Sequence, residues 1–166
     1  MKKGFTLIEL IVVIAIIGVL AAILVPAMLG YVKKSKVQAA NSTANEMLKA
    51  ANLALTDMAD EGIDPPNGCS SYGNLSDDSV FSQDLLVEYM QPYSDQINVN
   101  NFKVGIKNGV AVVCVAKTGK YYGASPKAWN NRSYDTKVPD GDFDTAWDCA
   151  VAAYNSAHTD DQYSED

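Results

Sequence analysis

The chain has 166 residues, 48% of them hydrophobic, and a net charge of −7 at pH 7. This length allows one modest domain besides an N-terminal segment and excludes two large domains. Residues 1–62 carry six lysines against five acidic residues, so the rest of the chain carries a charge of −8. Because an acidic domain repels phosphate backbones, we expect no direct binding of nucleic acid by it.

The first predicted element is an apolar segment. Residues 10–25 contain no charged side chain, and Lys2 and Lys3 come before them. Such a run is as long as a membrane-spanning helix needs, roughly 17–25 residues, and the two lysines favour a cytoplasmic N-terminus. Glu9 lies at the edge of this run, where a carboxylate costs about 2.5–3.5 kcal/mol and needs a partner. We therefore expect Glu9 to have a function.

The start of the chain, Lys2-Lys3-Gly4-Phe5-Thr6-Leu7-Ile8-Glu9, followed by the apolar run and Pro26, resembles the class III signal of type IV pilins. The resemblance covers about the first third of the chain. It implies that a membrane peptidase cuts between Gly4 and Phe5 and methylates the new amine of Phe5. It also implies the α+β ladle fold of pilins, a long helix kinked near Pro26 whose C-terminal half packs on an antiparallel sheet of about three to four strands.

Three other interpretations of the N-terminal segment fit less well. A secretory signal peptide has an apolar core of about 7–15 residues, which is shorter than this run. A simple signal anchor requires neither Glu9 nor the Gly4–Phe5 junction. A buried core helix would be amphipathic rather than uniformly apolar.

From Tyr31 the apolar residues become periodic. They recur at steps of three and four, which indicates an amphipathic helix: Val37, Ala40, Ala44, Met47, Ala51, Leu55 and Met58. Gly62, followed by Asp-Pro-Pro, is a helix stop. The sequence therefore predicts a nearly continuous helix from about Thr6 to about Glu61, roughly 80 Å long.

Pro26 removes one backbone hydrogen bond and should kink or locally open this helix. We expect the stretch Gly18–Pro26 to melt first, and the resemblance implies the same, since pilins partly unfold there in filaments. The chain then divides into a leader (1–4), a transmembrane or filament-core helix (5–30), an amphipathic helix of the head (31–61) and the globular head (62–166).

The head begins with a predicted loop over residues 63–79, rich in Pro, Gly, Asn and Ser. A short helix, capped by residues 76–78, follows and ends before Pro92. Residues 102–107 then alternate, Asn108-Gly109 forms a type I′ turn, and residues 110–116 return as the second strand of a hairpin. This turn predicts three pairs whose side chains all pack on the long helix: Ile106 with Ala111, Val104 with Val113, and Phe102 with Val115.

The opposite face of this hairpin is too apolar to be bare, so a later segment should cover part of it. A third strand is expected at residues 120–122 and a short helix from about Asp144 to Ser156. The acidic residues from His158 onward should be frayed.

Three cysteines, Cys69, Cys114 and Cys149, permit one intramolecular disulfide. An extracytoplasmic location would allow it to form. The sequence does not select the pair.

The acidic residues Asp140, Asp142 and Asp144 are spaced like the start of a calcium loop. The segment departs from the EF-hand pattern, because Thr145 stands where Gly is needed and Val151 where the bidentate Glu should be. The alternative is a solvated loop in which Asp142 or Asp144 caps a helix. Calcium is therefore a candidate ligand, and no other cofactor is expected.

Aromatic side chains crowd the last third of the chain, notably Tyr121, Tyr122, Trp129 and Trp147. Their flat apolar faces and polar tips suit adhesion to a surface ligand such as polysaccharide. Packing in the core or between subunits is the favoured alternative, because most such residues are buried.

No enzyme activity is expected. The single histidine, His158, lies in the acidic C-terminal segment, where a Ser-His-Asp or Cys-His site has no framework. There is no Gly-rich loop of the P-loop or dinucleotide-binding type.

The resemblance implies a structural subunit of a type IV pilus that serves adhesion or motility. Its partners would be copies of itself, the prepilin peptidase and the assembly machinery, together with the membrane before assembly. The precursor would span the cytoplasmic membrane with its N-terminus inside, and the product would be an extracellular filament. The alternatives are a pseudopilin of a type II secretion or DNA-uptake machine and a membrane-anchored surface adhesin that does not polymerise.

The physics of Glu9 fits a filament. In an apolar bundle of helices, its carboxylate would pair with the positive amine of Phe5 in a neighbouring subunit. Because an unpaired buried charge costs several kcal/mol, packing in any other register would be penalised.

Overall fold

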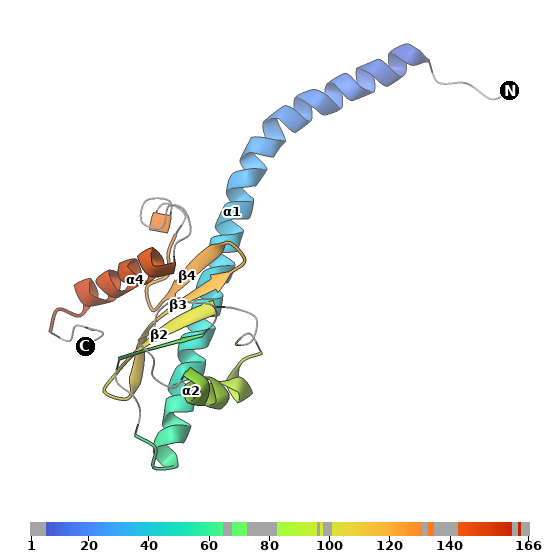
Figure 1. Ribbon diagram of the computed structural model, residues 1–166. Coiled ribbons are helices and arrows are strands. Elements are labelled where there is room, and N and C mark those ends of the chain that lie inside the picture. Colours follow the sequence, from blue (N-terminus) through green and yellow to red (C-terminus); the bar gives the residue numbers. More distant parts are fainter. Residues whose placement is uncertain are drawn as a thin grey trace. The chain divides into compact units, whose positions relative to one another are not determined.

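The structure is a computed structural model that describes residues 6–64, 68–72, 83–95, 97, 101–130, 133–134, 143–160 and 163. Its elements in chain order are α1 (Leu7–Asp60), β1 (Gly68–Tyr72), α2 (Gln83–Met90), the 3-10 helix η1 (Gln91–Tyr93), β2 (Asn101–Lys107), β3 (Val110–Thr118), β4 (Tyr121–Ser125) and α4 (Phe143–Ala157) (Figure 1). The chain divides into two compact units, Met1–Ser35 and Lys36–Asp166, and we call the second unit the head.

Helix α1 confirms the predicted long helix to within one residue at each end. Pro26 lies inside it. Its C-terminal stop is a Schellman motif, in which the Ile63 N–H donates to the Met58 carbonyl at 2.9 Å and the Gly62 N–H to the Ala59 carbonyl at 3.0 Å. Gly62 has a φ of 77°, a left-handed conformation that favours glycine.

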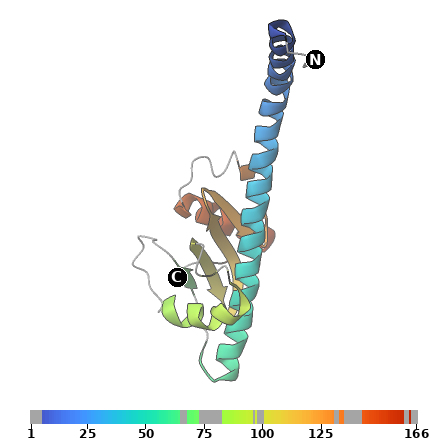
Figure 2. The same ribbon diagram turned by 90° about the vertical axis from the view of Figure 1, so that its right-hand side faces the viewer.

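Within the head, α1 packs on the sheet through the predicted stripe (Figure 2). All seven predicted residues are buried: Val37, Ala40, Ala44, Met47, Ala51, Leu55 and Met58. Helix α2 confirms the predicted short helix and packs on the same side of the sheet through Leu86, Val87 and Met90. The predicted cap at residues 76–78 lies outside the described residues.

The sheet is antiparallel, with the strand order β1-β2-β3-β4. The third predicted strand is β4, and the predicted α+β architecture is confirmed. Strand β1 was predicted to be loop, which is wrong. Its sequence, Gly-Cys-Ser-Ser-Tyr, contains no β-branched residue and no alternation, and it becomes a strand by pairing at the edge of β2.

The β2–β3 hairpin turns at Asn108 and Gly109, whose φ values of 51° and 75° confirm the predicted type I′ turn. Ile106 pairs with Ala111 as predicted. Beyond that pair the predicted register is wrong, because a bulge adds one residue to β3.

The consequence of this bulge is an exchange of faces along β3. Val104 pairs with Cys114 and Phe102 with Ala116, so Cys114 and Ala116 face α1. Val113 and Val115 lie in a second cluster, on the other face of the sheet. A shift of one residue reverses the face of every side chain that follows.

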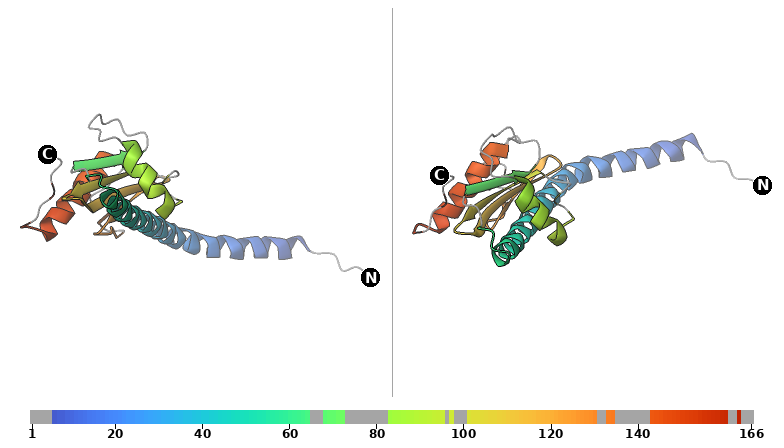
Figure 3. Two further views of the ribbon diagram at one scale, coloured as in Figure 1. Left: turned by 90° about the horizontal axis from the view of Figure 1, so that it is seen from below. Right: turned by 60° about the horizontal axis from the view of Figure 1, so that its bottom comes forward.

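Helix α4 covers this other face, which confirms that a later segment lies over the hairpin (Figure 3). It confirms the predicted C-terminal helix and buries Phe143, Ala146, Trp147, Ala150 and Tyr154.

One residue of the segment that was predicted to be frayed packs against the head instead. Tyr163 is buried, and its ring contacts Trp147 edge-on at a centroid distance of 6.1 Å. The Asn155 side chain forms two hydrogen bonds, of 2.7 and 2.9 Å, with the backbone of Tyr163. A Cβ atom at Gly105 would lie 2.7 Å from the Tyr163 ring, so the missing side chain makes room for the tyrosine.

Two asparagines join α1 to the backbone of the sheet. The Asn41 side chain donates to the Trp129 carbonyl and accepts from the N–H groups of Ala124 and Trp129. Asn52 exchanges two hydrogen bonds of 3.0 Å with Ala111, at the part of β3 that β4 does not reach. Both side chains satisfy polar groups that would otherwise be left unpaired.

Candidate functional site

The candidate site is the N-terminal part of α1, which carries Glu9 and Pro26, two of the residues predicted to act in assembly. Gly4 and Phe5, the predicted processing residues, lie outside the described residues. From Leu7 to Val32 every large apolar side chain is exposed, by fractions between 42% and 75%. A contiguous apolar surface of this extent marks contact with a membrane or with other protein surfaces.

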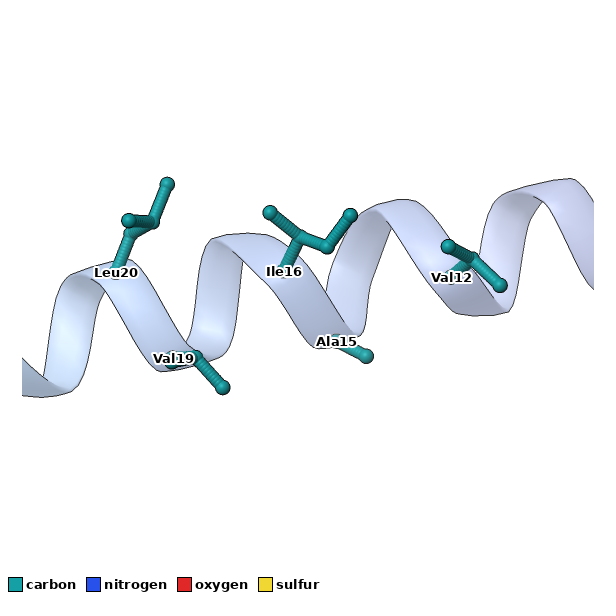
Figure 4. A pocket seen from close by; sticks show the side chains of 5 residues that line it. All are labelled: Val12, Ala15, Ile16, Val19 and Leu20. Carbon is teal, nitrogen blue, oxygen red and sulfur yellow. The ribbon is translucent and has the colours of Figure 1, made fainter.

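Among the described residues, α1 is the one helix long and apolar enough to cross a membrane. Its exposed surface is apolar on all sides rather than along one stripe, so it does not match the surface of an ordinary helix in water. The surface is also grooved. Val12, Ile16 and Leu20 form one row, and Ala15 and Val19 form the row beside it, with a shallow groove between them (Figure 4). Rows of this kind are the ridges and grooves through which helices pack.

Glu9 caps its own helix in the single chain. Its carboxylate oxygen Oε2 accepts hydrogen bonds from the Thr6 N–H at 2.9 Å and from the Thr6 hydroxyl at 2.6 Å. The Glu9 N–H lies 3.4 Å from Thr6 Oγ1. This is a capping box, which satisfies backbone donors that have no partner within the helix. Its sequence signal, Thr-x-x-Glu, is present at residues 6–9 but was not among the predicted features.

Pro26 and the glycines of this stretch lie in open surroundings. Within α1, neither Gly18 nor Gly30 has an atom within 4 Å of an added Cβ. These glycines are therefore not needed to make space in the single chain. The expected melting between Gly18 and Pro26 in filaments stays a prediction.

Three of the four aromatic residues considered for adhesion are buried. Tyr122, Trp129 and Trp147 are 1%, 5% and 3% exposed. Tyr122 contacts Phe143, and Trp147 lies under the Lys103 ammonium at 4.7 Å. They therefore serve the core, as the favoured alternative held, because all three belong to the cluster that contains the buried residues of α4.

Tyr121 is half-buried, and it is the one residue of the four that keeps surface for a ligand. Its ring lies 6.1 Å from that of Tyr134 and has the Lys120 ammonium 5.5 Å above it.

The fold separates Cys114 from the other two cysteines. Cys69 lies on β1 and Cys114 on β3, two strand spacings or roughly 10 Å apart, which is too far for a disulfide. Cys149 belongs to the cluster on the opposite face of the sheet. Cys114 is a free thiol, and burial raises its pKa. Of the three possible pairs, Cys69 with Cys149 is the one that these positions leave open.

The calcium site stays a prediction. Asp140 and Asp142 lie outside the described residues, and Asp144 is exposed in the first turn of α4. Among the described residues, no group of three or more His, Cys, Asp or Glu side chains could hold a metal ion. The histidine is not part of a catalytic arrangement there either: His158 stacks on Tyr154 at 4.2 Å and its Nδ1 lies 3.0 Å from the Tyr154 carbonyl oxygen.

Comparison with known proteins places the chain in a family. The family model described as the prokaryotic N-terminal methylation motif matches residues 1–25. The type IV major fimbrial protein FimA of Dichelobacter nodosus is 46% identical over 57 residues, 34% of this chain and 36% of that protein. The chain thus spans about a third of the length of this relative. No solved structure matches the chain.

Two further relatives extend the match into the head. A fimbrial protein of Neisseria meningitidis is 32% identical over 118 residues, covering 71% of this chain and 58% of the relative. A fimbrial protein of Dichelobacter nodosus is 31% identical over 109 residues, which cover 66% of this chain and 68% of the relative. With the long N-terminal helix packed on an antiparallel sheet, this similarity shows that the chain belongs to the type IV pilin family of fimbrial proteins.

Proposed function

We propose that this chain is a structural subunit of a type IV pilus, made as a membrane-anchored precursor and assembled into a filament outside the cell. The observation that carries this proposal is the exposed, uniformly apolar surface of α1 from Leu7 to Val32. Two environments satisfy such a surface: a bilayer core about 30 Å thick and a bundle of identical helices. The protein would occupy the first before assembly and the second afterwards. Its family consists of fimbrial subunits, not of enzymes.

Processing after Gly4 would leave Phe5 as a methylated N-terminus. The matched methylation motif, which includes both residues, supports this step. Lys2 and Lys3 favour a cytoplasmic N-terminus before the cut. The peptidase that makes the cut and the machinery that extracts the subunit are the other partners that we propose.

Glu9 would change partners on assembly. In the single chain its carboxylate accepts two hydrogen bonds from Thr6. In a bundle of helices, the Phe5 amine of a neighbouring subunit would bring a positive charge to the same carboxylate. A buried carboxylate that lacked this partner would cost several kcal/mol, so Glu9 would fix the register of the subunits.

The names of the relatives favour a pilus over the other functions considered. Those relatives are called fimbrial proteins. A pseudopilin of a secretion or DNA-uptake machine and a non-polymerising adhesin therefore rank second. The filament would act in adhesion or motility. In adhesion, the half-buried Tyr121 would be the aromatic side chain that contacts a polysaccharide.

The substitution Glu9→Ala tests the proposal. We expect the variant to be processed and inserted into the membrane but to yield no surface filaments by electron microscopy. Glu88→Ala, which removes an exposed carboxylate from α2, is the matched control and should polymerise normally. Mass spectrometry of the mature protein should find a methylated Phe5. Normal filaments from Glu9→Ala, or an uncut Met1, would refute the proposal.

A further inference from the structure

The apolar surface of α1 ends in a short polar segment. Tyr31 is 74% exposed, and Val32 is the last exposed side chain of that surface. Lys33, which is half-buried, and Lys34, which is exposed, follow directly. All four residues lie in the first compact unit, and α1 continues through them without a break. The change from apolar to basic side chains therefore takes place within about one helical turn.

The spacing between this segment and Glu9 matches the thickness of a membrane. Glu9 and Tyr31 are about 33 Å apart along the helix, at 1.5 Å per residue. The hydrocarbon core of a bilayer is about 30 Å thick. If Glu9 lies at one surface of that core, Tyr31 reaches the other surface, and Lys33 and Lys34 extend beyond it among the lipid headgroups.

The residue types of the segment are those that occur at a membrane interface. Tyrosine is enriched there, because its ring is apolar and its hydroxyl is polar. A lysine keeps its hydrocarbon stem along apolar surface while its ammonium reaches the polar layer. Each ammonium has three N–H donors, which phosphate oxygens can accept. Lys33 and Lys34 therefore fit the phosphates of lipid headgroups.

The charge of the segment favours anionic lipids over zwitterionic ones. The sequence contains no acidic residue between Glu9 and Glu46, whereas it contains Lys33, Lys34 and Lys36. Glu46 lies about 18 Å beyond Lys34 along α1, which exceeds the Debye length of about 8 Å at physiological ionic strength. Within α1, which is described from its first residue to its last, no carboxylate lies close enough to neutralise Lys34.

We propose that Tyr31, Lys33 and Lys34 bind the headgroups of anionic phospholipids before assembly. The inference rests on the proposed function, which places α1 in a membrane at that stage, and adds the class of lipid that the anchor prefers. The two lysines hold their end of the span in the headgroup layer, so that Glu9 stays at the level of the opposite surface. Extraction into a filament then requires these contacts to break.

Acidic side chains of a neighbouring subunit would also attract these lysines. Such a partner explains the charges alone, whereas a headgroup layer explains the charges, the exposed tyrosine and the distance from Glu9. Successive residues are turned by about 100° around a helix, so Lys33 and Lys34 leave α1 in different directions. A lipid layer surrounds the helix and meets both lysines, whereas a single docking surface lies on one side.

The lipid preference of the full-length chain tests the contact. The chain is reconstituted in phosphatidylcholine bilayers that contain spin-labelled phosphatidylglycerol or spin-labelled phosphatidylcholine, and EPR spectroscopy measures the fraction of each label at the protein. The unsubstituted chain should prefer phosphatidylglycerol about threefold, and the double variant Lys33→Gln/Lys34→Gln should lose at least about half of this preference. Because glutamine and lysine have similar helix propensities, α1 itself should be unchanged.

Two controls separate the headgroup contact from a general effect of charge. Lys49→Gln removes an exposed lysine about 22 Å beyond Lys34 along α1, and it should leave the preference unchanged. A salt concentration of 1 M, which shortens the Debye length to about 3 Å, should lower the preference of the unsubstituted chain and narrow its difference from the double variant.

The outcomes separate the inference from the proposed function. Equal preferences of the unsubstituted chain and the double variant would overturn the inference, whether or not filaments form. Equal preferences together with a loss of filaments in the double variant would assign the lysines to a neighbouring subunit instead. A chain that does not enter bilayers at all would overturn both. A chain that shows the lipid preference but forms no filaments would overturn the proposed assembly and leave the headgroup contact standing.

Discussion

The two halves of α1 belong to one helix but differ in the size and the exposure of their apolar side chains. From Leu7 to Val32 the side chains are mostly large, branched and exposed on all sides. From Val37 to Met58 the helix buries one stripe that is dominated by alanine: Ala40, Ala44, Ala50, Ala51 and Ala54. Among the described residues, the large apolar side chains of the first half are exposed, whereas the second half packs its stripe on the sheet.

The difference shows how side-chain size selects the partner of a helix. A stripe of small side chains lets the helix backbone approach a sheet closely, and here it reaches the backbone of β4 at Gly123. A uniformly apolar surface specifies no single neighbour, so it suits lipid as well as several copies of itself. The contrast predicts that substitutions in the second half change the stability of the head. Substitutions in the first half should change assembly instead.

The largest effect on stability is expected at Gly123. A methyl group there would meet the Ala40 carbonyl at 2.0 Å, and backbone atoms cannot move away as a side chain could. Gly123→Ala should therefore destabilise the head by more than about 3 kcal/mol. Thermal unfolding in detergent, followed by circular dichroism, measures the change.

Gly18→Ala is the matched control from the first half of α1. Its added methyl group meets nothing within 4 Å, so the unfolding of the head should not change. Equal losses of stability from the two substitutions would contradict the distinction between the halves.

The second effect concerns Asn41, which is 8% exposed. Asn41→Leu would leave the N–H groups of Ala124 and Trp129 and one carbonyl unpaired in the core. The expected loss is about 2–3 kcal/mol, and it is measured by urea unfolding. Asn45→Leu, an exposed position one turn further along α1, should change the stability by less than about 0.5 kcal/mol.

Asn52 should contribute less, because it is only half-buried and water can replace part of its bonding. Asn52→Ala removes the two hydrogen bonds to Ala111 and should cost about 1 kcal/mol in the same urea experiment. A loss as large as that of Asn41→Leu would mean that water does not reach this edge of β3.

The parts of the fold that could be predicted from the sequence are those with a strong local signal. The periodic stripe, the Gly62 stop and the Asn108-Gly109 turn each determine local structure directly, and the structure confirms all three. The bulge in β3 could not be predicted, because residues 110–116 are apolar without interruption and the sequence therefore fits both registers equally well. Strand β1 and the burial of Tyr163 depend on contacts distant in sequence, with β2 and with Gly105.

The candidate site divides in the same way. The predicted role of Glu9 followed from one charge beside an apolar run, a signal that needs no tertiary structure. Its hydrogen bonds to Thr6 required the geometry of the helix start. The burial of Trp129 and Trp147 could not be predicted from their residue type, because an aromatic side chain suits a core and a binding surface equally.

The smallest effect is expected at the end of the second half, where α2 and η1 meet α1. Hydrogen bonds to Glu61 and Asp57 raise the pKa values of Tyr89 and Tyr93 above their usual value of about 10. Because the neutral phenol is the donor, its contribution to stability is complete below pH 10 and is lost as the pH rises through the raised pKa. Unfolding midpoints of the unsubstituted chain and of the double variant Tyr89→Phe/Tyr93→Phe measure it. The unsubstituted chain should be slightly more stable at pH 8, and the difference should vanish or reverse near pH 11.5. A difference that stays constant across this range would show that the two hydroxyls do not hold α2 and η1 to the carboxylates of α1.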